Sequence, residues 1–303
     1  MKNKKNFLFL TLSILFCLNI LAWLAVYDLN KSQLLEVNFF NVSQGDAIFI
    51  ETPERNQILI DGGPSSIILE KLGREMAFWD RSINLIILTH PEHDHLAGLI
   101  EVLKRYKVEN ILWTGVKRDT AEYEEWLERI KKEKAKIFIA KAGQKIACEK
   151  RSLGFQPREM RMRPCEFSME VLYPFENLEG KELKDSNNTS IVAKLIFGQN
   201  SFLFTGDAYK SVERELLEKG IDINSDIVKV AHHGSKTSSA EEFIEKVSPE
   251  TAIISVGKDN TYGHPHQEVL ETLEKYGIRI LRTDLDGDIK IISDGKNYEI
   301  SNF

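Results

Sequence analysis

Four short segments of this chain concentrate histidine and carboxylate side chains, the residue types that bind divalent metal ions. The densest reads THPEHDH at residues 89–95, and the others read FTGD at 204–207, VAHHGS at 230–235 and NTYGHP at 260–265. Neutral imidazole and carboxylate suit a divalent transition metal, and no cysteine flanks any of the four segments. The combination favours a hydrolytic metal site over a closed structural site.

Each of these segments follows the end of a predicted strand, although the last three would each be more often an ordinary polar loop when taken alone. Together they would converge on one edge of a sandwich. An aspartate at a strand end, such as Asp207, can bridge two cations and hold a shared hydroxide between them.

The elements that must position these segments are predicted from hydrophobic periodicity between residues 34 and 303. Period-two patterns predict strands at 36–42, 47–51, 57–61, 85–89, 110–113, 137–140, 170–173, 191–196, 202–205, 227–230, 252–256, 279–282 and 289–292. Helical patterns cover 65–77, 97–106, 121–134, 209–218, 240–247 and 267–276. This order favours two mixed sheets with helices outside them.

Composition excludes several classes of protein. Hydrophobic residues make up 42% of the chain and charged residues 28%, which argues against a disordered, collagen-like or multi-span membrane protein. The formal net charge of −6 excludes a polycation that coats nucleic acid, and three cysteines are too few for a disulfide scaffold. The segment 141–166 is locally basic, with seven basic and three acidic residues. We interpret it as a solvated surface loop or hairpin, with a polyanion-contacting patch as the alternative.

The amino-terminal segment predicts a membrane anchor. Lys2, Lys4 and Lys5 precede an almost entirely apolar run at 7–27, close to the ~20 residues that a helix needs to cross a bilayer. A retained anchor is favoured over a cleaved signal peptide, because the nearest cleavage site places Trp23 where a small residue is required. The lysines place the body of the chain outside the cytoplasm. We therefore expect an anchor and linker at 1–32 and a hydrolase domain at 33–303.

The chain resembles the metallo-β-lactamase-fold hydrolases, and specifically the hydrolase domain of the ComEC-type competence proteins. The resemblance extends from residue 35 to residue 294. It rests on FNVSQGDA at 40–47, LIDGG at 59–63, the 90–95 cluster, NNTS at 187–190, TGD at 205–207, HHGS at 232–235, YGHP at 262–265, and RTD and DG within 282–287. The fold that it implies is a four-layer αββα sandwich preceded by one transmembrane helix.

The resemblance also implies a ligand set for two divalent metal ions. It assigns His90 and Glu92 to one metal, Asp94 and His95 to the other, Asp207 between them, His233 as an additional ligand, and His232 and His264 near the scissile group. Two departures stand out in this sequence. Glu92 occupies the place of the second histidine of the general His-x-His-x-Asp-His pattern, so His93 falls on a spacer and should face away. The usual third-motif histidine is missing near Asn187, and a site richer in oxygen shifts the expected metal from strictly zinc towards zinc or manganese.

The expected function is that of a membrane-anchored, exported phosphodiesterase or nuclease that acts on DNA by a two-metal, bridging-hydroxide mechanism. One alternative is hydrolysis of a small or cell-wall substrate, such as a phosphorylcholine ester, a lactone or a β-lactam. A third possibility is a metal-poor binding module attached to the envelope. Two details stay open: Asp61 orients a ligating histidine or caps a turn, and Cys148 and Cys165 form a disulfide or remain free thiols.

Overall fold

The computed structural model describes residues 2–29, 34–149, 152–156, 167–183 and 185–302. The chain divides into two compact units, residues 1–33 and 34–303. The first contains helix α1 (Lys2–Leu29). Its stretch Lys4–Trp23, with a mean hydropathy of 2.0, is long and apolar enough to cross a membrane.

The larger unit is built on two mixed eight-stranded sheets. The first has the order β16-β15-β1-β2-β3-β4-β5-β6. Its strands are β1 (Leu35–Phe39), β2 (Ile48–Glu51), β3 (Gln57–Ile60), β4 (Ser82–Leu88), β5 (Lys107–Trp113), β6 (Lys136–Ile139), β15 (Ile289–Ser293) and β16 (Tyr298–Asn302). The second has the order β14-β13-β12-β11-β10-β9-β7-β8. Its strands are β7 (Lys145–Glu149), β8 (Ser152–Gln156), β9 (Phe167–Tyr173), β10 (Val192–Phe197), β11 (Asn200–Phe204), β12 (Ile227–Lys229), β13 (Thr251–Ile254) and β14 (Arg279–Arg282).

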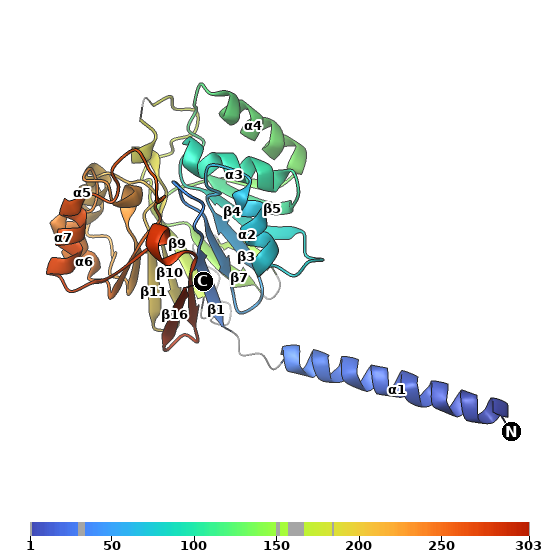
Figure 1. The fold of residues 1–303 in the computed structure, drawn as a ribbon. Coiled ribbons are helices and arrows are strands. Elements are labelled where there is room, and N and C mark those ends of the chain that lie inside the picture. The colour runs from blue at the N-terminus through green and yellow to red at the C-terminus, as the bar shows by residue number, and fades with distance from the viewer. Residues whose placement is uncertain (1, 30–33, 150–151, 157–166, 184, 303) are drawn as a thin grey trace. The chain divides into compact units, whose positions relative to one another are not determined.

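Helices cover the outer face of each sheet, as Figure 1 shows. The first sheet packs against α2 (Ile67–Glu75), α3 (His93–Leu103) and α4 (Ala121–Glu133), and the second against α5 (Lys210–Glu218), α6 (Glu241–Val247) and α7 (Gln267–Lys275). A short helix, α8 (Thr283–Asp286), follows β14. The central apolar core lies between the sheets, and a further apolar layer lies under each set of helices. The predicted four-layer αββα sandwich is therefore confirmed.

Strand β4 shows why this sequence forms a central strand. Leu85 and Ile87 belong to the core between the sheets, whereas Ile86 and Leu88 belong to the layer under α2, α3 and α4. A parallel strand buried on both faces needs such a continuous apolar run. The 89–95 cluster follows β4 directly, so this buried strand fixes where the cluster begins.

Helix α3 and strand β16 differ from the predicted pattern. Helix α3 begins at His93, four residues before the predicted start, because Glu92 has the extended backbone of an N-cap and polar residues fill the first turn. Strand β16, which pairs with β15 at a sheet edge, was not predicted. The basic segment forms the β7–β8 hairpin where it is described, one of the two forms expected for it. Residue 165 lies outside the described residues, so the pairing of Cys148 with Cys165 stays a prediction.

Candidate metal centre

Four side chains from three separate segments of the sequence meet in one group, and three of the four are buried. Asp94, His95, Asp207 and His233 each offer a ligand atom, and these atoms lie within 4.8 Å of one another. Asp207 Oδ2 lies 3.4 Å from His95 Nε2 and 3.3 Å from His233 Nε2. Asp94 Oδ2 lies 3.3 Å from His233 Nε2. All four belong to the predicted ligand set.

The sheets bring these residues together at the carboxyl ends of their strands. His90 follows β4, and Asp94 and His95 lie in the first turn of α3. Asp207 follows β11, and His233 follows β12. Because β11 and β12 pair in parallel, their ends lie at the same edge of the second sheet. Because residues 93–95 form the first turn of a helix, adjacent residues of the 89–95 cluster point in different directions.

The histidines present free nitrogen atoms inside the protein. Among the described residues, the Nε2 atoms of His90, His95 and His233 are buried without a hydrogen-bond partner. The opposite ring nitrogen, Nδ1, is held in each case: by Thr89 Oγ1 at 3.0 Å for His90, by Asp61 Oδ2 at 2.8 Å for His95 and by the Ser255 carbonyl at 2.8 Å for His233. Imidazoles oriented in this way beside carboxylates are the donor set that a divalent transition metal requires. The residues present therefore fit a bound metal ion.

Asp61 has the orienting role that the sequence left open. It is fully buried, and its Oδ1 accepts a hydrogen bond from the Thr89 amide at 2.8 Å, while its Oδ2 faces both the Thr89 hydroxyl and His95 Nδ1. Burial raises the pKa of Asp61 despite the opposing effect of His95. The contact fixes the tautomer of His95 that leaves Nε2 as the ligand atom.

A buried lysine next to the ligands escaped the sequence analysis. Lys229 Nζ donates to the Gly206 carbonyl at 2.9 Å, forms an ion pair with Asp46, and lies 3.5 Å from Asp207 Oδ1. Both Lys229 and Asp46 are about 1% exposed. The signal was a lysine within the apolar run 227–230, because such a buried lysine needs an acidic partner. Asp46 entered the sequence analysis only as part of the segment at 40–47.

The charges of the four-residue group favour the binding of cations. Burial alone would lower the pKa values of His95 and His233, but Asp207 and its neighbouring carboxylates raise both well above the ordinary value. Burial would raise the pKa of Asp207, yet His233, His95 and Lys229 hold it well below the usual range. His90 has a pKa lowered to about 3, first by burial and then by His95. His90 is thus neutral and ready to coordinate, whereas the carboxylates attract cations.

Glu92 and His93 occupy different surroundings from this group. Arg118 Nη2 lies 2.8 Å from Glu92 Oε1, and the Ser186 hydroxyl donates to the same carboxylate. Glu92 thus lies outside the four-residue group described above, although it lines the same pocket. The His93 side chain is 59% exposed, with Nδ1 2.7 Å from Glu122 Oε1, so it faces away from the ligands as expected.

An open pocket of about 350 Å³ gives access to the centre. Its lining includes the proposed catalytic residues together with polar neighbours: Gln44, Glu92, Asp94, Asp185, Asn187, Asp207, His232, His233, Tyr262 and His264. Asn187 Nδ2 lies 3.3 Å from His232 Nε2, and the rings of His232 and His264 are 5.4 Å apart. Burial, reinforced by the neighbouring His233 and His232, lowers the pKa of His264 to about 4. The pocket therefore places two imidazoles above the ligands.

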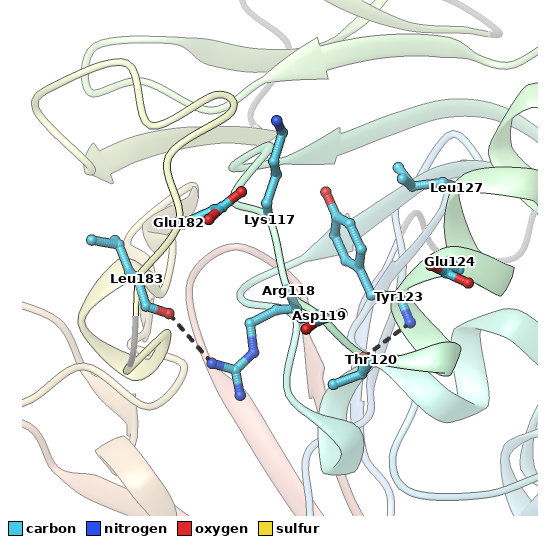
Figure 2. Close-up of a pocket in the computed structure, with 9 residues that line it drawn as sticks. All are labelled: Lys117, Arg118, Asp119, Thr120, Tyr123, Glu124, Leu127, Glu182 and Leu183. Atoms are coloured by element: carbon cyan, nitrogen blue, oxygen red, sulfur yellow. Dashed lines mark hydrogen bonds between the residues drawn. The ribbon is translucent and has the colours of Figure 1, made fainter.

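A second pocket of about 740 Å³ lies beyond Arg118. Figure 2 shows Arg118 donating to the Leu183 carbonyl, at 3.4 Å, between the loop that carries it and the loop that carries Glu182. The same guanidinium pairs with Glu92, so Arg118 connects the two pockets.

Comparison with known families identifies the larger unit. A sequence profile of the metallo-beta-lactamase superfamily matches residues 40–258. The chain belongs to this superfamily. It is 32% identical over 291 residues to ComE operon protein 3 of Bacillus subtilis, which covers 90% of this chain and 35% of that protein. It is also 40% identical over 119 residues to the competence protein ComA of Neisseria gonorrhoeae, covering 38% of this chain and 17% of that protein. The similarity to competence proteins is thereby confirmed, and the chain spans about a third or less of the length of these relatives.

Solved structures agree with the fold of this superfamily member. The metallo-beta-lactamase fold protein YhfI of Bacillus subtilis superposes with a TM-score of 0.53 at 11% identity, over 86% of this chain and all of that chain. The CmlA beta-hydroxylase gives a TM-score of 0.51 at 12% identity, over 84% of this chain and 53% of that chain. At such low identity the likeness concerns the fold alone.

Proposed function

We propose that this superfamily member hydrolyses phosphodiester bonds, with DNA as its polymeric substrate. Metal-dependent hydrolysis is supported by the superfamily match and by the cluster of possible metal ligands. The observation that carries the choice of substrate is the similarity to ComE operon protein 3 over 90% of this chain.

The proposed ligand set keeps the arrangement expected from the sequence. His90 and Glu92 would hold one ion, Asp94 and His95 would hold the other, Asp207 would lie between them and His233 would be an additional ligand, with zinc or manganese as the metal. Divalent ions in such a site, when bound, lower the pKa of water and stabilise the negative charge of a phosphoryl transition state. The protein contributes orientation through Asp61 and compensating positive charge through Lys229.

His232 and His264 are proposed to act on the substrate itself. Thr237 Oγ1 lies 3.0 Å from His232 Nδ1, which leaves Nε2 of His232 directed towards Asn187 and the pocket. Burial lowers the pKa values of both His232 and His264, so each is neutral in the free protein at pH 7. A bound phosphodiester carries a negative charge that opposes this lowering. An imidazole that takes up a proton from solvent in this way can then hold a phosphate oxygen or deliver that proton to the leaving alkoxide.

The proposed location is the outer face of the cell membrane. The candidate span Lys4–Trp23 and the lysines before it support a single-pass anchor with its amino terminus in the cytoplasm. A phosphatase fused after Phe303 should be active, because phosphatase reporters fold outside the cytoplasm. An inactive phosphatase together with an active cytoplasmic reporter at the same point would overturn this topology.

Metal analysis and activity of matched variants test the proposed chemistry. The purified chain should contain zinc or manganese and cleave single-stranded DNA and bis(p-nitrophenyl) phosphate. Asp207→Asn and Asp94→Ala should lower the rate by several powers of ten without unfolding the domain. His93→Ala is the matched control and should retain nearly full activity, because its side chain is exposed.

Three results would contradict this assignment in distinguishable ways. Loss of activity in His93→Ala with retention in Glu92→Gln would show that the ligand register is wrong. Hydrolysis of a phosphorylcholine ester, a lactone or a β-lactam without cleavage of DNA would favour a small or cell-wall substrate. A chain that binds no metal under any loading condition would be a binding module.

A further inference from the structure

Two exposed aromatic side chains mark a surface far from the chemistry. Phe78 and Trp79 are 79% and 74% exposed, the highest values among large hydrophobic residues in the described part of residues 34–303. Their rings meet edge to face, with centroids 4.7 Å apart. Full burial of an aromatic side chain is worth about 1.5–3 kcal/mol, so exposing two adjacent ones has a cost that a binding partner would remove.

The turn that carries this aromatic pair is held firmly by its neighbours. Asp80 accepts hydrogen bonds from Gln57 Nε2 at 2.8 Å and from the Ser82 hydroxyl at 2.9 Å. The Arg81 carbonyl accepts from the Lys107 amide at 2.8 Å, and the Arg81 guanidinium lies 3.2 Å from the Tyr106 hydroxyl. The aromatic pair is thus presented on an ordered turn between α2 and β4.

Strand register places this turn at the end of the first sheet where β1 begins. Glu36 pairs with Glu51, and Glu51 with Gln57 on β3. β3 and β4 run in parallel, with Ile58 opposite Leu85. The starts of β1, β3 and β4 therefore lie at one end of the sheet, and the aromatic turn precedes β4 at that end. The metal ligands follow the opposite ends of the strands.

The same end of the domain is tied to the candidate membrane span. The candidate span ends at Trp23, helix α1 ends at Leu29 and β1 begins at Leu35. The last residues of α1 and residues 30–34 therefore form the tether. However this tether is arranged, the six residue steps from Leu29 to Leu35 reach no farther than about 22 Å, and the six helical residues after Trp23 add about 9 Å. A domain of this length has a radius of gyration of about 18 Å and is therefore wider than the tether is long. If α1 spans the membrane, the start of β1 is the point of the domain that is connected to it, through this short segment of chain.

The chemistry of the turn fits a lipid surface. Tryptophan and phenylalanine favour the boundary between headgroups and acyl chains, where their rings leave water. Arg81, in the same turn, and Lys107, whose amide donates to the Arg81 carbonyl, are both exposed, which suits anionic headgroups. Asp80, the acidic residue of the turn, already bonds to Gln57 and Ser82.

We propose that Phe78 and Trp79 dock the domain onto the bilayer that holds the chain's own anchor. This contact turns the metal centre away from the membrane, towards polymers in the surrounding space. The inference rests on the proposed single-pass anchor, but it does not depend on the identity of the substrate.

Site-specific fluorescence in the full chain tests this docking. The three native cysteines are replaced by serine, and an environment-sensitive nitrobenzoxadiazole label is attached at Trp79→Cys. The matched control carries the label at Leu285→Cys, because Leu285 is 70% exposed and follows β14 at the ligand end of the second sheet. Both chains are reconstituted in vesicles of phosphatidylcholine and phosphatidylglycerol. A nitroxide lipid should quench position 79 at least about threefold more strongly than position 285, while iodide quenches mainly position 285.

The outcomes separate lipid from other partners and docking from catalysis. Equal quenching of the two positions by the nitroxide lipid would overturn the proposal. Protection of position 79 from both quenchers would assign the aromatic pair to a protein contact, such as a second copy of the chain, and would also overturn it. Hydrolysis of bis(p-nitrophenyl) phosphate is measured on the same samples. Lost hydrolysis with retained lipid quenching would refute the proposed function and leave the docking intact.

Discussion

Replacement of Lys229 by methionine tests whether the buried lysine compensates for the charge of the metal centre. Lys229 Nζ forms an ion pair with Asp46 and lies 3.5 Å from Asp207 Oδ1. Removing one partner of a buried ion pair costs about 3–5 kcal/mol, because the remaining charge has lost its compensation. Whole domains are stable by only about 5–15 kcal/mol, so Lys229→Met should lower the midpoint of urea unfolding markedly in chelator.

Bound metal should reduce this loss. Without metal, the carboxylates of Asp46, Asp61, Asp94 and Asp207 face three cations: Lys229 and the two imidazoles whose pKa values are raised. Lys229→Met leaves only two cations against four carboxylates. Two divalent ions supply four positive charges, which match the carboxylates even without the lysine. The difference in unfolding free energy between wild type and variant should therefore shrink when zinc or manganese saturates both proteins.

A double variant provides the control for this experiment. Lys229→Met combined with Asp46→Asn removes both charges, so it should recover a large part of the stability lost in the single variant. Urea unfolding is followed by circular dichroism, with chelator or with saturating metal. A loss below about 1 kcal/mol in chelator, or an equal loss with and without metal, would refute the charge-compensation argument.

The remaining predictions concern the second pocket contact, pH and helix packing. Arg118→Gln should release Glu92, a proposed ligand of one ion, from its ion pair with Arg118. The affinities of the protein for its first and second metal ions, measured by calorimetric titration, should then become more similar. Two unchanged affinities would contradict this. Burial raises the pKa of Glu213 from 4.5 to about 7, so its stabilising contribution is complete below pH 4.5 and is lost as pH rises through 7. Between pH 4.5 and 8 the unfolding free energy of wild type should fall by about 3 kcal/mol more than that of Glu213→Gln, and parallel profiles would contradict this. Gly98→Ala should destabilise the domain by about 1–3 kcal/mol, because a Cβ there would lie 1.8 Å from the Gly62 carbonyl oxygen. Gly73→Ala, a helical glycine with open space, should stabilise the domain by up to about 1 kcal/mol, and thermal unfolding of both variants is the measurement.

Periodicity predicted the strands and helices that are amphipathic or doubly buried, and it missed elements that are neither. The strands that periodicity did not predict are β7, β8 and β16. β8 and β16 lie at the edges of their sheets, where polar residues protect an unpaired strand and weaken the alternation of the sequence, and β7 pairs with β8 in the basic hairpin. The early start of α3 at His93 was hidden for a related reason. Its first turn is polar because it carries Asp94 and His95, and hydrophobic periodicity begins only after them.

The candidate site was predictable as a set of residue types at strand ends, but its charge pairs were not. Lys229 with Asp46, and Arg118 with Glu92, are contacts between residues far apart in the sequence. No local pattern encodes such a partner. A lysine in a buried strand indicates that an acid must be near, and only the folded sheets show which acid it is.

Backbone conformation shows why the positions of Asp61, His232 and His233 depend on the whole fold. Asp61, His232 and His233 have φ angles of 57°, 50° and 53°, in the left-handed region that non-glycine residues avoid. Each such residue costs roughly 1–2 kcal/mol, and strain of this kind persists only where the surrounding structure enforces it. Here the enforcement is visible, because the Ser255 carbonyl holds His233 Nδ1 and His95 holds Asp61. The left-handed turn brings His232 to the pocket and His233 to the ligands, although the two are neighbours in the chain. In a relaxed helical turn or strand, the two adjacent imidazoles would not point to the pocket and to the ligands as they do here. The strain is therefore part of how one short segment supplies both a ligand and a substrate-facing group.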